Sequence, residues 1–170
     1  TELALHTPHG DAELLLPLLG RHNVLNALGA AAAALAAGAG LQDVQAGLEG
    51  LDSVAGRLQR KTRADGGLVI DDTYNANPAS LRAAIDVLAG LPGERWLVLG
   101  DMGELGADAA ALHAEIGDYA RAAGIDRLFT LGALAVQAAR ACGGRAQAFD
   151  DFAASGTDEA TNRRLLGLDR

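Results

Sequence analysis

The sequence predicts an α/β fold with a mostly parallel, doubly wound sheet. After Arg57, short apolar runs alternate with amphipathic stretches of about 10–15 residues, which is the strand–helix–strand pattern of a parallel sheet. The chain has 170 residues, of which 49% are hydrophobic and only 4% are aromatic. The core must therefore be built from leucine, valine, isoleucine and alanine, and alanine favours helices that lie close to a sheet.

The first part of the chain predicts two antiparallel strands followed by two helices. Leu3 and Leu5 alternate with polar residues, the chain turns at His9–Asp11, and a second strand follows at Glu13–Leu16. Helical spacing of apolar residues and terminal glycines then predict helices at about His22–Ala37 and Leu41–Leu51.

The second part of the chain follows an expected linker at Asp52–Gly56, so we assign residues 1–55 and residues 56–170 to different domains. Its first two strands are joined by a turn at Asp65–Gly67, and strands and helices alternate from there on. The expected strands are at 58–63, 68–71, 96–99, 127–131 and 145–149, and the expected helices are at 79–89, 108–123, 134–141 and 159–166.

Composition and charge exclude several classes of protein. The 14 Lys+Arg and 22 Asp+Glu give a formal net charge of −8, so nucleic acid is not an expected partner. A single cysteine, Cys142, excludes an internal disulfide and a cysteine-based zinc site, which favours a reducing compartment. The most apolar run, Ala27–Ala39, is too short to span a bilayer, and no signal peptide is evident. We therefore expect a cytoplasmic protein without membrane insertion.

The loop Asp71–Pro78 is unusually rich in hydrogen-bonding side chains. In open α/β sheets, ligands bind beyond the carboxyl ends of the strands, where this loop is expected. A carboxylate there could accept hydrogen bonds from a ribose diol, and a phenol or amide could fix a small polar ligand. The same string also suits a plain capping turn, with Asn77 as N-cap and Pro78 in the first turn of the next helix. The residues alone favour neither interpretation.

A second loop, Gly100–Gly106, contains three glycines and two carboxylates. Asp101 and Glu104 could face a cation such as Mg²⁺. A strand-to-helix turn with an acidic helix N-terminus is the favoured interpretation. His113, on the helix that follows, is expected to cap or to lie on the surface rather than to bind a metal.

Two further strings contain polar groups suited to a nucleotide. His22, Asn23 and Asn26 cluster in the first turns of the long helix, where amides can read a purine edge. Arg57 follows Gly56 at the expected joint, and the planar guanidinium fork of arginine suits phosphate. Each string alone fits a structural role at least as well.

Taken together and in order, GRHNVLNALGAAAAA, GR, VIDDTYNANPASLRAAIDVL and LVLGDMGELG resemble the Mur ligase family. The resemblance covers about residues 14–152, and DDTYNANP with GDMGELG is similar to the branch that adds D-alanyl-D-alanine. Such ligases have a domain for the UDP-linked sugar, a central ATPase domain with a P-loop, and a Rossmann-like C-terminal domain. The resemblance implies that residues 1–55 are the C-terminal portion of the central domain and that residues 56–170 are the C-terminal domain, with an atypical or truncated last part.

The resemblance also implies an activity and its site residues. The reaction would be ATP-dependent addition of D-alanyl-D-alanine to UDP-N-acetylmuramoyl-tripeptide through an acyl phosphate, with ATP and Mg²⁺ as cofactors, in bacterial peptidoglycan synthesis. By position, the amides of Asn23 and Asn26 match groups near the adenine, Arg57 matches an arginine that reaches the phosphates, and Asp72 matches a carboxylate that holds the ribose. Tyr74, Asn75 and Asn77 match a loop that faces the dipeptide.

The sequence departs from the family pattern at two places. No G-x-x-x-x-G-K-[ST] string occurs, and no catalytic residue or protein metal ligand is expected, so this chain alone is expected to be inactive. A Lys-Gly-Ser-Arg motif usual in the family is replaced by TNRRLLGLDR. A noncatalytic α/β module that binds a nucleotide or a protein is the alternative, and folylpolyglutamate synthetase is a lesser rival that DDTYNANP disfavours. The oligomeric state is not predicted.

Overall fold

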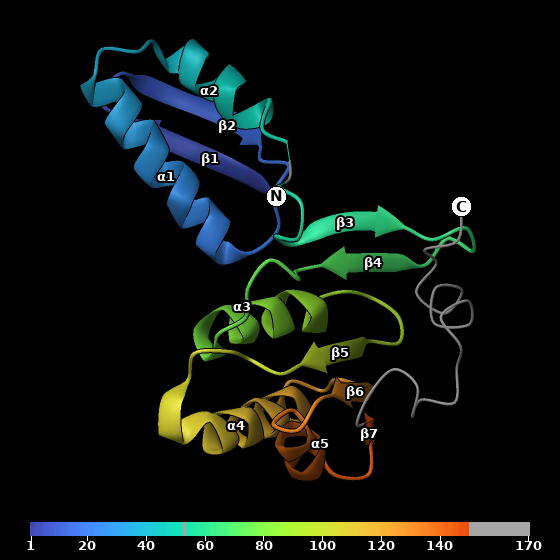
Figure 1. The fold of residues 1–170 in the computed structure, drawn as a ribbon. Coiled ribbons are helices and arrows are strands. Elements are labelled where there is room, and N and C mark those ends of the chain that lie inside the picture. The colour runs from blue at the N-terminus through green and yellow to red at the C-terminus, as the bar shows by residue number, and fades with distance from the viewer. Residues whose placement is uncertain (53, 150–170) are drawn as a thin grey trace.

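The computed structural model describes residues 1–52 and 54–149, which form three small sheets, two of them with helices packed against them (Figure 1). Two of the sheets are antiparallel pairs, and the third has three parallel strands. Two separate groups of buried residues form the cores, one within residues 3–48 and one within residues 76–146. The assignment of residues 1–55 and 56–170 to different domains stays a prediction. The helix expected at 159–166 lies outside the described residues.

The first core joins a hairpin to two helices. Strand β1 (Glu2–Thr7) pairs with β2 (Gly10–Leu15) around the predicted turn, with Leu3 opposite Leu14. Alternation puts Leu3, Leu5 and Leu14 on one face, and helices α1 (Arg21–Ala36) and α2 (Leu41–Glu49) cover it. The buried residues of this core are Leu5, Leu14, Leu16, Ala27, Ala31, Val44 and Leu48. Both predicted helices are confirmed to within two residues at each end. The hairpin is confirmed too, but its second strand starts at Gly10, three residues before the predicted start, so the turn is tighter than expected.

The second antiparallel pair lies between the two cores along the chain. Strands β3 (Gln59–Thr62) and β4 (Leu68–Asp71) are connected by a tight turn in which Arg63 N–H donates to the Gly67 carbonyl at 2.8 Å. The Asp65 carboxylate accepts the Gly67 N–H at 3.0 Å, which closes the turn. Within the described residues, β4 pairs only with β3.

The third sheet carries the predicted strand–helix alternation. Helix α3 (Pro78–Ala89) leads to β5 (Trp96–Gly100), and a 3₁₀ turn at Gly106–Asp108 leads to α4 (Ala109–Ala122). Strand β6 (Arg127–Leu131), helix α5 (Val136–Cys142) and strand β7 (Ala146–Phe149) follow. The strands are parallel in the order β5-β6-β7, with Val98 opposite Phe129. The predicted parallel α/β sheet is therefore confirmed.

The described helices cover only one face of this sheet. Inward-facing Leu99 and Leu128 are buried in a single cluster with residues from α3, α4 and α5. On the opposite face, Trp96 and Val98 are 48% and 61% exposed, and the Trp96 ring contacts Phe129. The sequence predicted a doubly wound sheet, with helices on both faces, and the described part does not show this. The crossovers through α4 and α5 run in the same direction, β5 to β6 to β7, and such right-handed crossovers place their helices on the same side of the sheet.

An ion pair across the β3–β4 hairpin makes stability depend on pH. The Lys61 ammonium donates to Asp71 Oδ2 at 2.6 Å, and the Thr73 hydroxyl and N–H donate to Oδ1. These bonds, with the lysine first, hold the pKa of Asp71 below its ordinary value. A lowered folded-state pKa stabilises the fold above the ordinary carboxyl pKa, and that contribution is lost as the pH falls through the folded value.

We expect Lys61→Met to raise the Asp71 pKa toward that of a free carboxyl, because the lysine is its main stabilising partner. The free energy of unfolding near neutrality should fall by about 0–1 kcal/mol, which is the contribution of an exposed ion pair, and the difference from the wild type should disappear as the pH falls through the folded pKa of Asp71. The measurement is an NMR pH titration of the Asp71 carboxyl together with acid unfolding. Arg60→Met removes the same charge one residue away, on the other face of the strand, and is the control. An equal shift in both variants would contradict a specific Lys61–Asp71 contribution.

Candidate functional site

A cavity of about 590 Å³ lies where the first turns of α1, the joint at residues 56–58, the loop after β4 and the start of α3 come together. It brings together six of the seven site residues predicted from the sequence. They are Asn23, Asn26, Arg57, Asp72, Tyr74 and Asn75. Figure 1 shows the start of α1 beside the joint that leads into β3 and above α3. Residues far apart in the sequence are therefore neighbours in one hollow.

The amide end of the cavity is formed at the start of α1. Asn23 Nδ2 donates to the Leu19 carbonyl at 2.7 Å, which holds the side chain against the turn before the helix. Asn26 Nδ2 lies 3.4 Å from Asn23 Oδ1, so the two amides are linked. His22 also lines the cavity. Amides held in this way present donors and acceptors at fixed positions, which suits the polar edge of a planar base.

The joint holds Arg57 between two residues with left-handed backbone conformations. Gly56 has a φ of 70° and Leu58 a φ of 47°. The Gly56 carbonyl accepts the Tyr74 N–H at 3.0 Å, and Asp72 Oδ1 accepts the Leu58 N–H at 3.0 Å. A left-handed backbone at a buried leucine costs about 1–3 kcal/mol, so the surrounding contacts must hold it there.

The cavity is lined by one permanently positive and one acidic side chain. The Arg57 guanidinium carbon lies 4.1 Å from the centroid of the Tyr74 ring, a stacked cation–π arrangement. One carboxylate oxygen of Asp72 accepts the Leu58 N–H, and the other makes no such bond to the described residues of the joint. A guanidinium for phosphate, a carboxylate for hydroxyls and amides for a base therefore surround one space.

Asn77 is the predicted site residue that does not line this cavity. Its side-chain oxygen accepts the Ser80 N–H at 2.9 Å, and the Ser80 hydroxyl accepts the Asn77 N–H at 3.1 Å. These reciprocal bonds are a capping box at the start of α3, with Pro78 in the first turn. Asn77 therefore occupies the capping position that the sequence offered as one of its two interpretations. Its role toward a substrate stays a prediction.

The glycine-rich loop at residues 100–106 is held by protein groups. Asp101 Oδ1 accepts the N–H groups of Leu134 and Ala135 at 3.0 and 2.6 Å, so it binds the turn that leads into α5. The Met102 N–H donates to His113 Nε2 at 2.9 Å, while His113 Nδ1 donates to the Ala109 carbonyl at 2.7 Å. His113 is fully buried, so the surface position expected as one alternative was wrong. The favoured structural interpretation of the loop agrees with these bonds.

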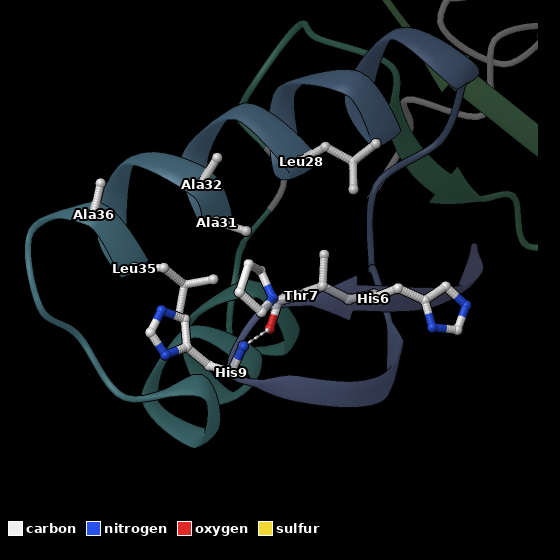
Figure 2. Close-up of a pocket in the computed structure, with 10 residues that line it drawn as sticks. His6, Thr7, His9, Leu28, Ala31, Ala32, Leu35 and Ala36 are labelled. Atoms are coloured by element: carbon white, nitrogen blue, oxygen red, sulfur yellow. Dashed lines mark hydrogen bonds between the residues drawn. The ribbon is translucent and has the colours of Figure 1, made fainter.

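A second hollow, of about 400 Å³, lies between the β1–β2 turn and α1. Figure 2 shows Leu28, Ala31 and Leu35 of α1 on one side and Thr7 and His9 of the turn on the other. The His9 N–H donates to the Thr7 hydroxyl at 3.1 Å, which closes the turn. This groove is mostly apolar and contains none of the predicted site residues.

Two features bear on metals and membranes. Among residues 1–52 and 54–149, no three histidine, cysteine or acidic side chains are close enough together to hold a metal ion. None of the helices in these ranges combines the length and the apolar character needed to cross a bilayer.

Comparison with known proteins shows the protein family to which this fold and cavity belong. Residues 56–163 match the family described as Mur ligase, glutamate ligase domain. The chain belongs to the Mur ligase family, as the sequence strings suggested.

Several of the similar proteins share one name. The UDP-N-acetylmuramoyl-tripeptide–D-alanyl-D-alanine ligase of Escherichia coli is 52% identical over 132 residues, which are 78% of this chain and 29% of that protein. The enzyme of the same name from Mycobacterium tuberculosis is 44% identical over 135 residues. A crystal structure of MurF from Acinetobacter baumannii superposes with a TM-score of 0.81 at 40% identity, covering 87% of this chain and 32% of that one. The chain thus spans less than a third of the length of these relatives.

Sequence reasoning missed part of the cavity. Ala79, Ser80 and Ala83 of α3 contribute to its wall, and so does Leu58. Small and apolar residues provide shape rather than chemistry, so nothing in the string distinguishes them from ordinary helix residues. The stacking of Arg57 on Tyr74 was also missed, because it joins two loops whose approach only the fold determines.

Proposed function

We propose that this chain is a segment of an ATP-dependent ligase that adds D-alanyl-D-alanine to UDP-N-acetylmuramoyl-tripeptide. The observation that carries the proposal is the convergence of Asn23, Asn26, Arg57 and Asp72 on one cavity. The names of relatives that are 52% and 44% identical support the substrate assignment. The proposal includes a bacterial cytoplasmic location, where ATP and UDP-linked precursors are available.

The proposed division of labour follows the chemistry of each group. The linked amides of Asn23 and Asn26 would contact the adenine edge, and the Arg57 guanidinium would bind phosphate oxygens. The oxygen of Asp72 that is not bonded to Leu58 would accept a ribose hydroxyl. Tyr74, Asn75 and Asn77 would face the dipeptide side.

The described residues do not by themselves fit Mg²⁺. Asp72 is the one carboxylate lining the described cavity, and one of its oxygens already accepts a backbone N–H. Mg²⁺ requires near-octahedral oxygen coordination. In this proposal the ion would be held by phosphate oxygens and by groups outside these residues.

The proposed reaction has two steps. A carboxylate oxygen of the tripeptide attacks the γ-phosphorus of ATP, and ADP leaves with the electron pair of the broken P–O bond. The D-alanyl-D-alanine amine then attacks the acyl carbon, inorganic phosphate leaves, the amine loses a proton, and an amide bond results. Positioning and charge neutralisation dominate phosphoryl transfer, so a cation aimed at the phosphates is the main contribution expected from this segment.

A chimaera tests this function. The matching segment of the E. coli relative is replaced by residues of this chain, and phosphate release is measured with ATP, Mg²⁺, UDP-N-acetylmuramoyl-tripeptide and D-alanyl-D-alanine. We expect release that requires both the tripeptide and the dipeptide, whereas the 170-residue chain alone releases none above background, because it contains no P-loop string.

The parent enzyme and the isolated chain are the controls. A folded chimaera that is inactive while the parent is active would contradict the proposal and favour a noncatalytic binding module. Substrate-dependent turnover by the isolated chain would also contradict it, because the segment would then contain a complete catalytic centre.

A further inference from the structure

We propose that Tyr74 is a positioning residue for Arg57. Its ring holds the guanidinium over the cavity, at the place where the phosphate chain of a nucleotide would lie. This inference rests on the proposed function, and it gives Tyr74 a second role, toward the nucleotide, that acts through Arg57.

The backbone of Tyr74 is fixed to the residue before Arg57. The Tyr74 N–H donates to the Gly56 carbonyl at 3.0 Å. A Cβ atom added at Gly56 would lie 3.0 Å from Tyr74 N and 3.3 Å from Tyr74 Cβ, so the two segments touch at their backbones. Only glycine, with a φ of 70°, permits this approach without strain. The backbone of Tyr74, from which the ring extends, is therefore held next to the joint.

The backbone on the other side of Arg57 is fixed as well. Leu58 is buried and has a φ of 47°, and its N–H donates to Asp72 Oδ1 at 3.0 Å. Both neighbours of Arg57 are thus bonded to the loop at residues 72–74. Only the long side chain of Arg57 is then free to rotate, and ordering it costs conformational entropy. A flat ring beneath the guanidinium limits that rotation before any ligand binds.

Core packing does not account for Tyr74. The side chain is 66% exposed, among the most exposed of the large hydrophobic residues described. Its ring has one face on the guanidinium and forms part of the cavity wall. An exposed ring paired with a cation is suited to orient that cation while leaving its N–H groups free for an anion.

The first test needs no ligand. A ring 4.1 Å from the guanidinium carbon shifts the NMR signals of the Arg57 side chain through its ring current. We expect Tyr74→Phe to keep that shift and Tyr74→Leu to abolish it. Unchanged Arg57 signals in Tyr74→Leu, with the rest of the spectrum intact, would overturn the proposal.

The second test measures how the phosphates contribute to affinity. The dissociation constants of adenosine and ATP are compared for the wild-type chain and its variants. We expect Tyr74→Leu to lower the preference for ATP over adenosine about two- to fivefold, and Tyr74→Phe to retain it. In an Arg57→Ala background, Tyr74→Leu should cause no further loss, because its effect passes through the arginine.

The outcomes separate this inference from the function on which it rests. If the two substitutions are additive, or if Tyr74→Phe loses as much as Tyr74→Leu, Tyr74 contacts the ligand itself and the positioning role is wrong. If the wild-type chain binds ATP no better than adenosine, the phosphate role of Arg57 fails, and the proposed function with it. The ligand-free signals then show whether the Tyr74–Arg57 contact itself exists.

Discussion

Arg57→Ala is expected to lower the rate of D-alanyl-D-alanine addition by the chimaera about 10³-fold, which corresponds to about 4 kcal/mol of lost transition-state stabilisation. The reason is electrostatic: charge on the transferring phosphoryl group needs a positioned cation, and Arg57 provides the single permanent positive charge among the residues that line the described cavity. Arg57→Lys should recover only part of the rate, since a point charge replaces a planar fork. The measurement is kcat and KM for ATP in the presence of both substrates.

The control for this variant is Arg60→Ala. Arg60 is an exposed residue of β3 and does not line the cavity. Arg60→Ala therefore removes one positive charge, as Arg57→Ala does, without changing the cavity. We expect less than a twofold change in the kinetics of that variant. A loss below tenfold in Arg57→Ala, or an equal loss in both variants, would contradict the assignment of Arg57 to the phosphates.

Gly117→Ala is expected to destabilise the fold by about 1–3 kcal/mol or more, although alanine is the better helix former. Gly117 is buried on the face of α4 that packs against α5. An added Cβ would overlap the Ala138 carbonyl oxygen and would lie 2.7 and 2.8 Å from its carbonyl carbon and Cα. Backbone cannot move aside as a flexible side chain can, so the two helices must separate. Chemical denaturation of the wild type and the variant measures the effect.

A second helical glycine gives a control of opposite sign. Gly29 is exposed in the middle of α1, and an added Cβ would have no atom within 4 Å. Gly29→Ala should therefore stabilise by about 0.5–1 kcal/mol through helix propensity alone. Stabilisation by both substitutions would contradict the close approach of α4 and α5.

The secondary structure was predictable because its signals are local. The strand 68–71 and the helix that begins at Pro78 follow from apolar periodicity and from a proline in the first turn. The coverage of only one sheet face was not predictable, since it depends on the crossover direction rather than on any string. The closeness of Gly117 to Ala138 was hidden for a similar reason: a buried glycine and an exposed one look alike in a helical sequence.

The candidate site was predictable in its residue types and not in its internal contacts. Amide, guanidinium and carboxylate side chains indicated nucleotide chemistry, and the family strings ordered them. The resemblance gave no site role to Asp101 or His113. In the fold Asp101 binds the turn before α5, and His113 is a buried partner of the Met102 N–H. A polar side chain next to glycines fits a ligand and a backbone group equally well until the neighbouring elements are placed.

The central claim is that residues of this chain form part of a nucleotide site. The most direct test is titration of the isotope-labelled chain with ADP, followed by NMR. We predict weak, saturable binding, because association is costly and this chain supplies only part of the contact surface. The signals that shift should belong to Asn23, Asn26, Arg57 and Asp72 and their neighbours, and Asn26→Leu should weaken the binding. No shift at any ADP concentration, or shifts confined to the apolar groove between the β1–β2 turn and α1, would contradict the claim.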